Sequence, residues 1–167
     1  MNQLHFREAL RNFASGVTVV TTADQDRPAG MTVSAFSAVS LDPPLIQICV
    51  DRQAFTHEVI ARAGQFAVNI LAEDQAHLSR LFASHEQHKF ASVSYRRSDT
   101  GLPLLDGVLT ALECRVVEAV IAGDHTIYIG EVLATHSGAG APLLYYQSAY
   151  HQLPALEVVE RYAHVDS

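Results

Sequence analysis

Cysteine, positive charge and long apolar runs are all scarce in this 167-residue chain. The two cysteines, Cys49 and Cys114, each lie in an apolar run, and no Cys-x-x-Cys pair is present. A zinc ribbon and a thioredoxin-type site are therefore excluded. We expect both cysteines to be buried free thiols of a protein that works in a reducing compartment.

The shortage of positive charge limits the kinds of partner that the protein can bind. The chain has 11 lysines and arginines against 18 acidic residues, a formal net charge of −7, which argues against a protein that binds nucleic acid. No stretch approaches the roughly 18 to 20 apolar residues that a membrane helix requires. The N-terminus also lacks the basic start and apolar run of a signal peptide. The sequence predicts a soluble, cytoplasmic protein of one domain with no membrane partner.

Common catalytic signatures are missing as well. There is no Gly-x-Gly-x-x-Gly and no P-loop, and Gly138-Ala139-Gly140 lacks the third glycine of a phosphate-binding turn. His85 and His88 are one residue too close for the zinc motif in which two histidines share a helical face. We expect no metal site.

Apolar spacing predicts a mainly β domain with helices. Helical spacing occurs near 6–13, 55–63 and 78–82, and a terminal helix could follow Pro154. The segment 84–106 is polar, without a pattern, and is expected to be a long excursion. Turn-separated strands with inserted helices favour an antiparallel barrel. The expected strands are 17–22, 30–36, 45–50, 66–71, 112–118, 125–133 and 143–146.

Five blocks of sequence, in the same order, carry a resemblance to a known family. The blocks are Phe6-Arg7-Glu8-Ala9-Leu10 through Thr21, Gly30-Met31-Thr32-Val33-Ser34-Ala35-Phe36, Ser40-Leu41-Asp42-Pro43-Pro44-Leu45, Gly123-Asp124-His125 and Pro142-Leu143-Leu144-Tyr145-Tyr146. Together they closely resemble the short-chain flavin reductases, which supply reduced flavin to two-component monooxygenases. The likeness spans about residues 4–153 of a single domain, 1–167, and the tail 154–167 has no clear counterpart.

The resemblance implies a fold and a function. The fold is an FMN-binding antiparallel split β-barrel, homodimeric, with the flavin near the interface. The function is an NAD(P)H:flavin oxidoreductase that transfers hydride from NADH to FMN or FAD. The reduced flavin would serve a separate oxygenase that hydroxylates an aromatic-type substrate. NADPH is the other possible donor, but no arginine cluster suggests a site for its extra phosphate.

The resemblance also implies cofactor-binding residues on three segments. Thr32 and Ser34 alternate with apolar side chains on a strand and point to one face, and Ser34 would bond the polar edge of the flavin ring. Thr56, at a helix start, suits a phosphate or is a plain helix cap. Lys89 would pair with phosphate, or it is solvated, and Phe90 would pack on the flavin or anchor its loop. The full set is Met31, Thr32, Val33, Ser34, Ala35, Val50, Asp51, Arg52, Thr56, His57, His88, Lys89 and Phe90.

Gly123-Asp124-His125 is the most specific local motif. In the resembling family this loop lies over the flavin, and its histidine contacts the nicotinamide. His125 is therefore the expected catalytic residue, orienting or covering the stacked rings, whereas Asp124 is expected to form the turn. Alternatively, the histidine merely caps a strand. Three aromatic residues would line the same nicotinamide-binding mouth, or belong to the core: Tyr145, Tyr146 and Tyr150.

Two other functions compete with the reductase. One is a non-enzymatic flavin- or haem-binding carrier or sensor on the same barrel, against which Gly123-Asp124-His125 argues. The other is a flavin oxidase acting on a phosphorylated amine, which would need more basic residues than this chain has.

Overall fold

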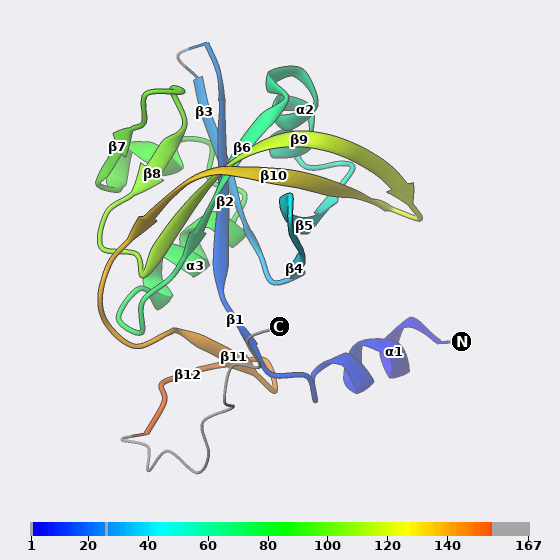
Figure 1. The fold of residues 1–167 in the computed structure, drawn as a ribbon. Coiled ribbons are helices and arrows are strands. Elements are labelled where there is room, and N and C mark those ends of the chain that lie inside the picture. Colours follow the sequence, from blue (N-terminus) through cyan, green and yellow to red (C-terminus); the bar gives the residue numbers. More distant parts are fainter. Residues whose placement is uncertain (1, 26, 155–167) are drawn as a thin grey trace.

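A seven-stranded antiparallel sheet forms the body of the protein (Figure 1). The computed structural model describes residues 2–25 and 27–154. None of the helices in those residues has the length and apolar composition of a membrane span. The helices are α1 (Gln3–Leu10), α2 (Phe55–Ala63), α3 (Ala76–Ala83) and the 3-10 helix η1 (Lys89–Ser92). The strands are β1 (Ser15–Gly16), β2 (Thr18–Asp24), β3 (Arg27–Val33), β4 (Phe36–Leu41), β5 (Pro44–Asp51), β6 (Gln65–Ile70), β7 (Tyr95–Arg97), β8 (Pro103–Leu105), β9 (Thr110–Ala122), β10 (His125–Ser137), β11 (Leu144–Tyr146) and β12 (Ala149–His151).

The two edges of the large sheet are neighbours in sequence. Its strand order is β3-β2-β6-β9-β10-β5-β4, and all its pairs are antiparallel. Only Ser34 and Ala35 separate the edge strands β3 and β4, so the sheet has to curl until its edges meet. On the β4 side of this link, the Cys49 backbone N–H of β5 donates to the Ala35 carbonyl over 3.1 Å, which continues the β4–β5 pairing by one residue into the link. The mainly β, antiparallel architecture expected from the sequence is confirmed.

Apolar side chains pack against both faces of the curled sheet. Val19 and Val20, adjacent on β2, are fully buried in two different core clusters because neighbouring side chains on a strand point to opposite faces. One cluster contains Ile48 and Phe66 and the other contains Phe82 of α3. Burial on both faces explains the dense β-branched run that predicted this strand.

Most expected elements are present. The second helix ends at Gly64, whose φ of 65° is the left-handed cap conformation. The expected strand 30–36 instead breaks at Ser34, and β4 starts at Phe36. The expectation for 84–106 is wrong in part: this stretch holds η1, β7 and β8, and Leu104 is buried in the core. The expected terminal helix after Pro154 lies outside the described residues.

A buried carboxylate ties the β7–β8 loop to the sheet. Glu113 on β9 is 5% exposed. It accepts a 2.6 Å hydrogen bond from the Thr100 hydroxyl, and its other oxygen lies 2.7 Å from Nε2 of His136. Burial raises the pKa of Glu113, but hydrogen bonds from Thr100, His136 and Ser98 together outweigh burial and hold that pKa below its ordinary value. The carboxylate is therefore ionised in the folded protein at neutral pH.

We expect Glu113→Gln to lower the free energy of unfolding at pH 7 by roughly 1.5–3 kcal/mol, the range for hydrogen bonds to a charged group. Because the folded pKa is depressed, this contribution is complete above the unfolded pKa of about 4.3 and is lost as pH falls through the folded value. Urea unfolding of the wild type and the variant at pH 7 and at pH 3 measures the loss of unfolding free energy and its dependence on pH. Glu131→Gln, which removes an ion pair to the exposed Arg115, is the matched control and should cost less than about 1 kcal/mol. An equal difference at both pH values would contradict this account.

Candidate functional site

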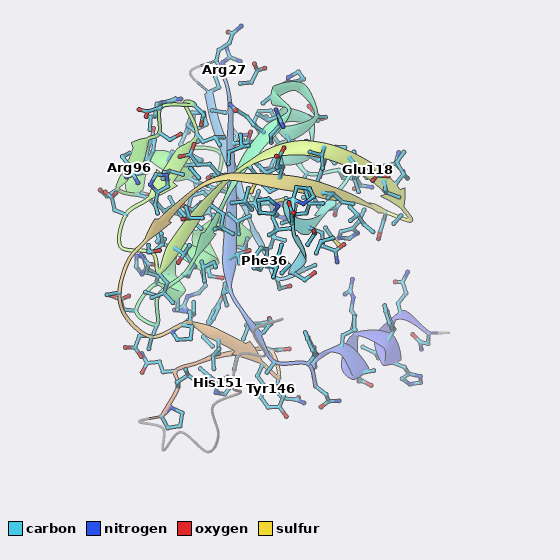
Figure 2. The ribbon with its side chains drawn as sticks, in the orientation of Figure 1. Arg27, Phe36, Arg96, Glu118, Tyr146 and His151 are labelled. Atoms are coloured by element: carbon cyan, nitrogen blue, oxygen red, sulfur yellow. The ribbon has the colours of Figure 1, made fainter. Side chains whose placement is uncertain are left out.

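A cavity of about 570 Å³ lies where the edges of the sheet meet. Three parts of the chain line it: the Ser34–Ala35 link with the adjoining strands β4 and β5, the N-terminal arm, and the β11–β12 hairpin. In Figure 2, Phe36 of β4 and Tyr146 of the hairpin are labelled, and these two residues belong to opposing walls. Pockets of this size hold a nucleotide-sized ligand.

The floor of the cavity is the outward face of β5. Ile46 and Ile48 point into the core, so Gln47 and Cys49 point the other way and line the cavity. The Gln47 side-chain amide donates to the Ser37 hydroxyl of β4 over 3.0 Å. Burial raises the pKa of the Cys49 thiol, so this side chain is a neutral part of the wall. Unlike Cys114, it is only partly buried, and the expectation of two buried thiols holds for one of them.

One wall is the N-terminal arm. The α1 helix begins after Asn2, whose side-chain oxygen accepts from the Leu4 backbone N–H over 2.9 Å. Arg7, Leu10 and Arg11 are spaced i, i+3 and i+4, so they share the face that lines the cavity. The helix buries none of its residues in the described protein.

The β11–β12 hairpin lines the cavity beside the arm and opposite β4. Its two-residue turn, Gln147 and Ser148, has φ angles of 50° and 63°, the conformation that glycine and asparagine usually adopt in such turns. The Gln147 backbone N–H donates to the Arg11 carbonyl over 3.2 Å, and its side-chain amide donates to Asn12 over 2.6 Å. The strained turn is therefore held against the arm.

Tyr150 anchors this hairpin to the body. Its hydroxyl lies 2.8 Å from the Ser79 hydroxyl of α3, and the Arg80 guanidinium lies 5.2 Å from the centre of its ring. Its ring is 5.4 Å from that of Tyr145, which lines the cavity. Tyr150 thus supports the cavity wall from behind.

His125 stands on the same face of the sheet as the cavity floor. It pairs across strands with Asp51, and Ile127, two residues along β10, pairs with Cys49. Directly paired residues share a face, so His125 lies about 7 Å along the strand from the row of Cys49. Its Nδ1 is 2.7 Å from the Asp124 carboxylate, which leaves Nε2 available. A hydrogen bond from His125 lowers the pKa of Asp124.

The turn before His125 is built as expected. Gly123, with a φ of 64°, occupies the first central position of the two-residue β9–β10 turn, and Asp124 the second. The Arg52 backbone N–H donates to the Asp124 carbonyl over 3.1 Å, which joins the β5–α2 loop to this turn.

The structure brings together some of the predicted site residues. Ser34, Ala35, Tyr145 and Tyr146 line the cavity. Three further predicted residues lie on β3, the strand before the link. Met31 packs against the core and Val33 is buried in it. The Thr32 hydroxyl donates to the Ser79 carbonyl over 2.7 Å.

Other predicted residues lie away from the cavity lining. Val50 is buried in the core. Thr56 is the second residue of α2 and 4% exposed, and the helix cap is Ala54. His57 Nε2 lies 2.9 Å from the Thr126 hydroxyl. Thr126 and His125 are neighbours on β10, so their side chains point to opposite faces.

The predicted basic–aromatic pair packs beside α3. The Lys89 ammonium donates to the Phe82 carbonyl over 2.9 Å and to the Gly30 carbonyl over 3.5 Å, and burial lowers its pKa. The Phe90 ring lies 5.2 Å from that of Phe82, in an edge-to-face contact. His88 is exposed at the start of η1.

Sequence reasoning missed several residues that line the cavity. Arg7 lies within the first resembling block, and its spacing to Arg11 was visible, but nothing in one sequence shows that the arm reaches the sheet link. Gln47 and Cys49 could have been found from strand alternation, since Ile46, Ile48 and Val50 mark the buried face. The others are Leu10, Phe13, Ser15, Phe36, Ser37, Gln147 and Ser148.

Comparison with known proteins gives a consistent result. The family model described as "Flavin reductase like domain" matches residues 10–154. An NADH-dependent flavin reductase from Rhodococcus sp. is 43% identical over 158 residues, covering 92% of this chain and 88% of the relative. A second relative is the reductase component of a 4-nitrophenol 4-monooxygenase/4-nitrocatechol 2-monooxygenase from Rhodococcus opacus. It is 37% identical over 168 residues, covering 100% of this chain and 90% of the relative.

A solved structure agrees with these relatives. The NADH:FAD oxidoreductase of Streptomyces globisporus, in complex with NAD and FAD fragments, superposes with a TM-score of 0.88. It is 33% identical, and the match covers 92% of this chain and 94% of that one.

Proposed function

The chain belongs to the flavin reductase like domain family, and on that premise we propose that it reduces FMN or FAD with NADH. A hydride, carrying two electrons and one proton, passes from the nicotinamide to the flavin ring, and a second proton comes from the medium. The enzyme is thus an oxidoreductase, as are the relatives named NADH-dependent flavin reductase.

The cavity at the sheet link is the observation that carries this proposal. A flavin requires a flat apolar wall, polar groups along its ring edge and compensation for its phosphate charge. The cavity offers the hydroxyls of Ser34 and Ser37, the neutral wall of Cys49 and two arginines, and its lining residues include no carboxylate. The donor set therefore fits a flavin nucleotide of about this volume.

We place the flavin ring against the Ser34–Ala35 link, with Ser34 at its polar edge. The strand that holds this link in place carries Met31, Thr32 and Val33. Roles for the segments at 50–57 and 88–90 remain predictions from the resemblance. They would require the nucleotide to extend beyond the cavity lining.

His125 is proposed to bind the nicotinamide half of NADH. Its position beyond Cys49, on the same face of the sheet, would let its ring cover the nicotinamide while the flavin lies nearer the link. The hydrogen bond to Asp124 fixes the imidazole orientation and leaves Nε2 to meet the carboxamide. The protein then needs only to hold the two rings in contact.

We expect His125→Ala to raise the KM for NADH about tenfold, the value of one lost hydrogen bond of roughly 1.4 kcal/mol, while FMN affinity stays within a factor of two. NADH oxidation is followed in steady state with saturating FMN, FAD or riboflavin. Flavin affinity is measured separately by fluorescence titration. His77→Ala, at an exposed histidine of α3 outside the cavity lining, is the matched control.

Two outcomes would count against these roles. A loss of FMN affinity with an unchanged KM would remove His125 from the nicotinamide site. If the wild-type protein bound flavin without oxidising NADH or NADPH, the reductase would be rejected in favour of the flavin- or haem-binding carrier or sensor.

The reduced flavin is proposed to serve a separate oxygenase. Support comes from the Rhodococcus opacus relative, whose name makes it the reductase component of a nitrophenol monooxygenase. An aromatic-type substrate for the partner oxygenase is proposed on the same basis. Reductase and oxygenase would meet in the cytoplasm, a reducing compartment that suits the free thiols of Cys49 and Cys114.

A closed split barrel and a homodimer complete the proposal. The two-residue link between the edge strands β3 and β4 supports closure, because it holds the two edges of the sheet close together. Uncovered apolar side chains on α1 and on the β9–β10 hairpin support a second copy as their partner, because such surfaces are seldom left in water. The exposed side chains outside the cavity lining are Leu4, Phe6, Val117, Val120, Ile121 and Leu133.

Sedimentation equilibrium should give twice the chain mass of 18.2 kDa. Ile121, 68% exposed on β9, should be central to that interface. Placing a charge there by Ile121→Glu should shift the equilibrium toward the monomer, because an unpaired buried charge is costly. A monomeric wild type across the micromolar range would contradict the dimer.

A further inference from the structure

We propose that Arg7 and Arg11 form a phosphate-binding site at the cavity. The ligand class is the phosphate or pyrophosphate of a nucleotide held there, so the inference rests on the proposed function and specifies how its ligand is recognised. The observation is a pair of arginines on one helix face in the wall of the cavity.

Helical geometry starts both arginine side chains from the same face of α1. The Arg11 backbone N–H donates to the Arg7 carbonyl over 3.2 Å, which keeps both residues on one helical turn. Side chains at i and i+4 start about 6 Å apart. Two planar guanidinium groups on side chains with that spacing can bind the oxygens of one phosphate or bridge a pyrophosphate.

Among the residues that the structure describes, neither guanidinium has a side-chain partner. Within residues 2–25 and 27–154, no carboxylate lies within 4.0 Å of Arg7 or Arg11. Other cations differ: Arg62 pairs with Asp24, Arg115 with Glu131, and Lys89 donates to backbone carbonyls. The unpaired arginines are thus available to an anionic ligand.

The local charge opposes that of the whole protein. The chain has a net charge of −7, yet the residues lining this cavity include two arginines and neither aspartate nor glutamate. A phosphate approaching the acidic surface would be repelled, and only a locally positive cavity offsets that repulsion. Charge-assisted hydrogen bonds from arginine are the usual means of phosphate recognition.

The backbone around the arginines is held in place. The Gln147 backbone N–H donates to the Arg11 carbonyl, and the Gln147 side chain donates to Asn12. The arm is thereby tied to the neighbouring β11–β12 hairpin, which also lines the cavity. A ligand bound by Arg11 would lie between the arm and the Ser34–Ala35 link.

The test compares FMN with riboflavin, which has the same ring and ribityl chain without the phosphate. Arg7→Gln, Arg11→Gln and the double variant are titrated with both flavins, and the KM for NADH is measured with riboflavin as acceptor. Arg27→Gln is the control, at an exposed arginine on the β2–β3 hairpin (Figure 2). Arg27 lies seven residues along the chain from Ser34, about 23 Å at the usual strand rise.

We expect the double variant to bind FMN about tenfold or more weakly, since charge-assisted hydrogen bonds are lost, while riboflavin affinity is unchanged. In the wild type, salt should weaken the binding of FMN and not of riboflavin, and the double variant should lose that difference. Arg7→Lys with Arg11→Lys should retain part of the FMN affinity, because the charge remains.

A second arm identifies the phosphate source. If FMN affinity holds and the KM for NADH rises instead, the pair binds the pyrophosphate of the nicotinamide nucleotide, which also supports the site. Unchanged values for both ligands would overturn the proposal. An equal loss of riboflavin and FMN affinity would also overturn it, since the arginines would then serve only as a wall.

Failure of the proposed function gives a different result. A wild type that oxidises no NADH, yet binds FMN through Arg7 and Arg11, keeps the phosphate site and removes the reductase. An active wild type whose arginine variants behave like Arg27→Gln keeps the reductase and removes the phosphate site.

Discussion

Only Ser34 and Ala35 separate the strands that form the two edges of the seven-stranded sheet. Because this link is so short, the sheet must curl to bring its two edges together, and the Ala35–Cys49 hydrogen bond extends the β4–β5 pairing into the link. The curl places one row of β5 side chains inside the core and turns Gln47 and Cys49 outward. The outward row forms a floor, over which the N-terminal arm and the β11–β12 hairpin supply walls. The cavity is therefore a consequence of how the sheet closes on itself.

Much of this architecture could be predicted from local sequence. Gly64 and the Gly123-Asp124 turn have the backbone chemistry that their positions require, and the β-branched run 17–22 is a strand buried on both faces. The segment 84–106 was predicted poorly because its charged and polar residues conceal a short apolar stretch. That stretch is buried only through contact with elements distant in the chain.

The site was predicted unevenly for a similar reason. Four residues named from contiguous motifs line the cavity, namely Ser34, Ala35, Tyr145 and Tyr146. Arg7 and Arg11 also line the cavity, and they were not predicted because this placement depends on where the arm lies, a long-range property that helical spacing does not reveal. Lys89 was predicted for its charge, and its ammonium contacts two backbone carbonyls. Residue type and spacing suggest candidates, whereas the fold determines which of them share a surface.

The central claim is that a flavin binds against the Ser34–Ala35 link. The most direct measurement is fluorescence titration of FMN with the wild type and with Ala35→Leu, whose larger side chain would project into the cavity. Ala38→Leu, at an exposed residue of β4 outside the cavity lining, controls for added apolar bulk. The account predicts that Ala35→Leu keeps wild-type resistance to urea and binds FMN at least about tenfold more weakly, a loss of roughly 1.4 kcal/mol, while Ala38→Leu binds FMN normally. Wild-type FMN affinity in a folded Ala35→Leu protein would contradict it.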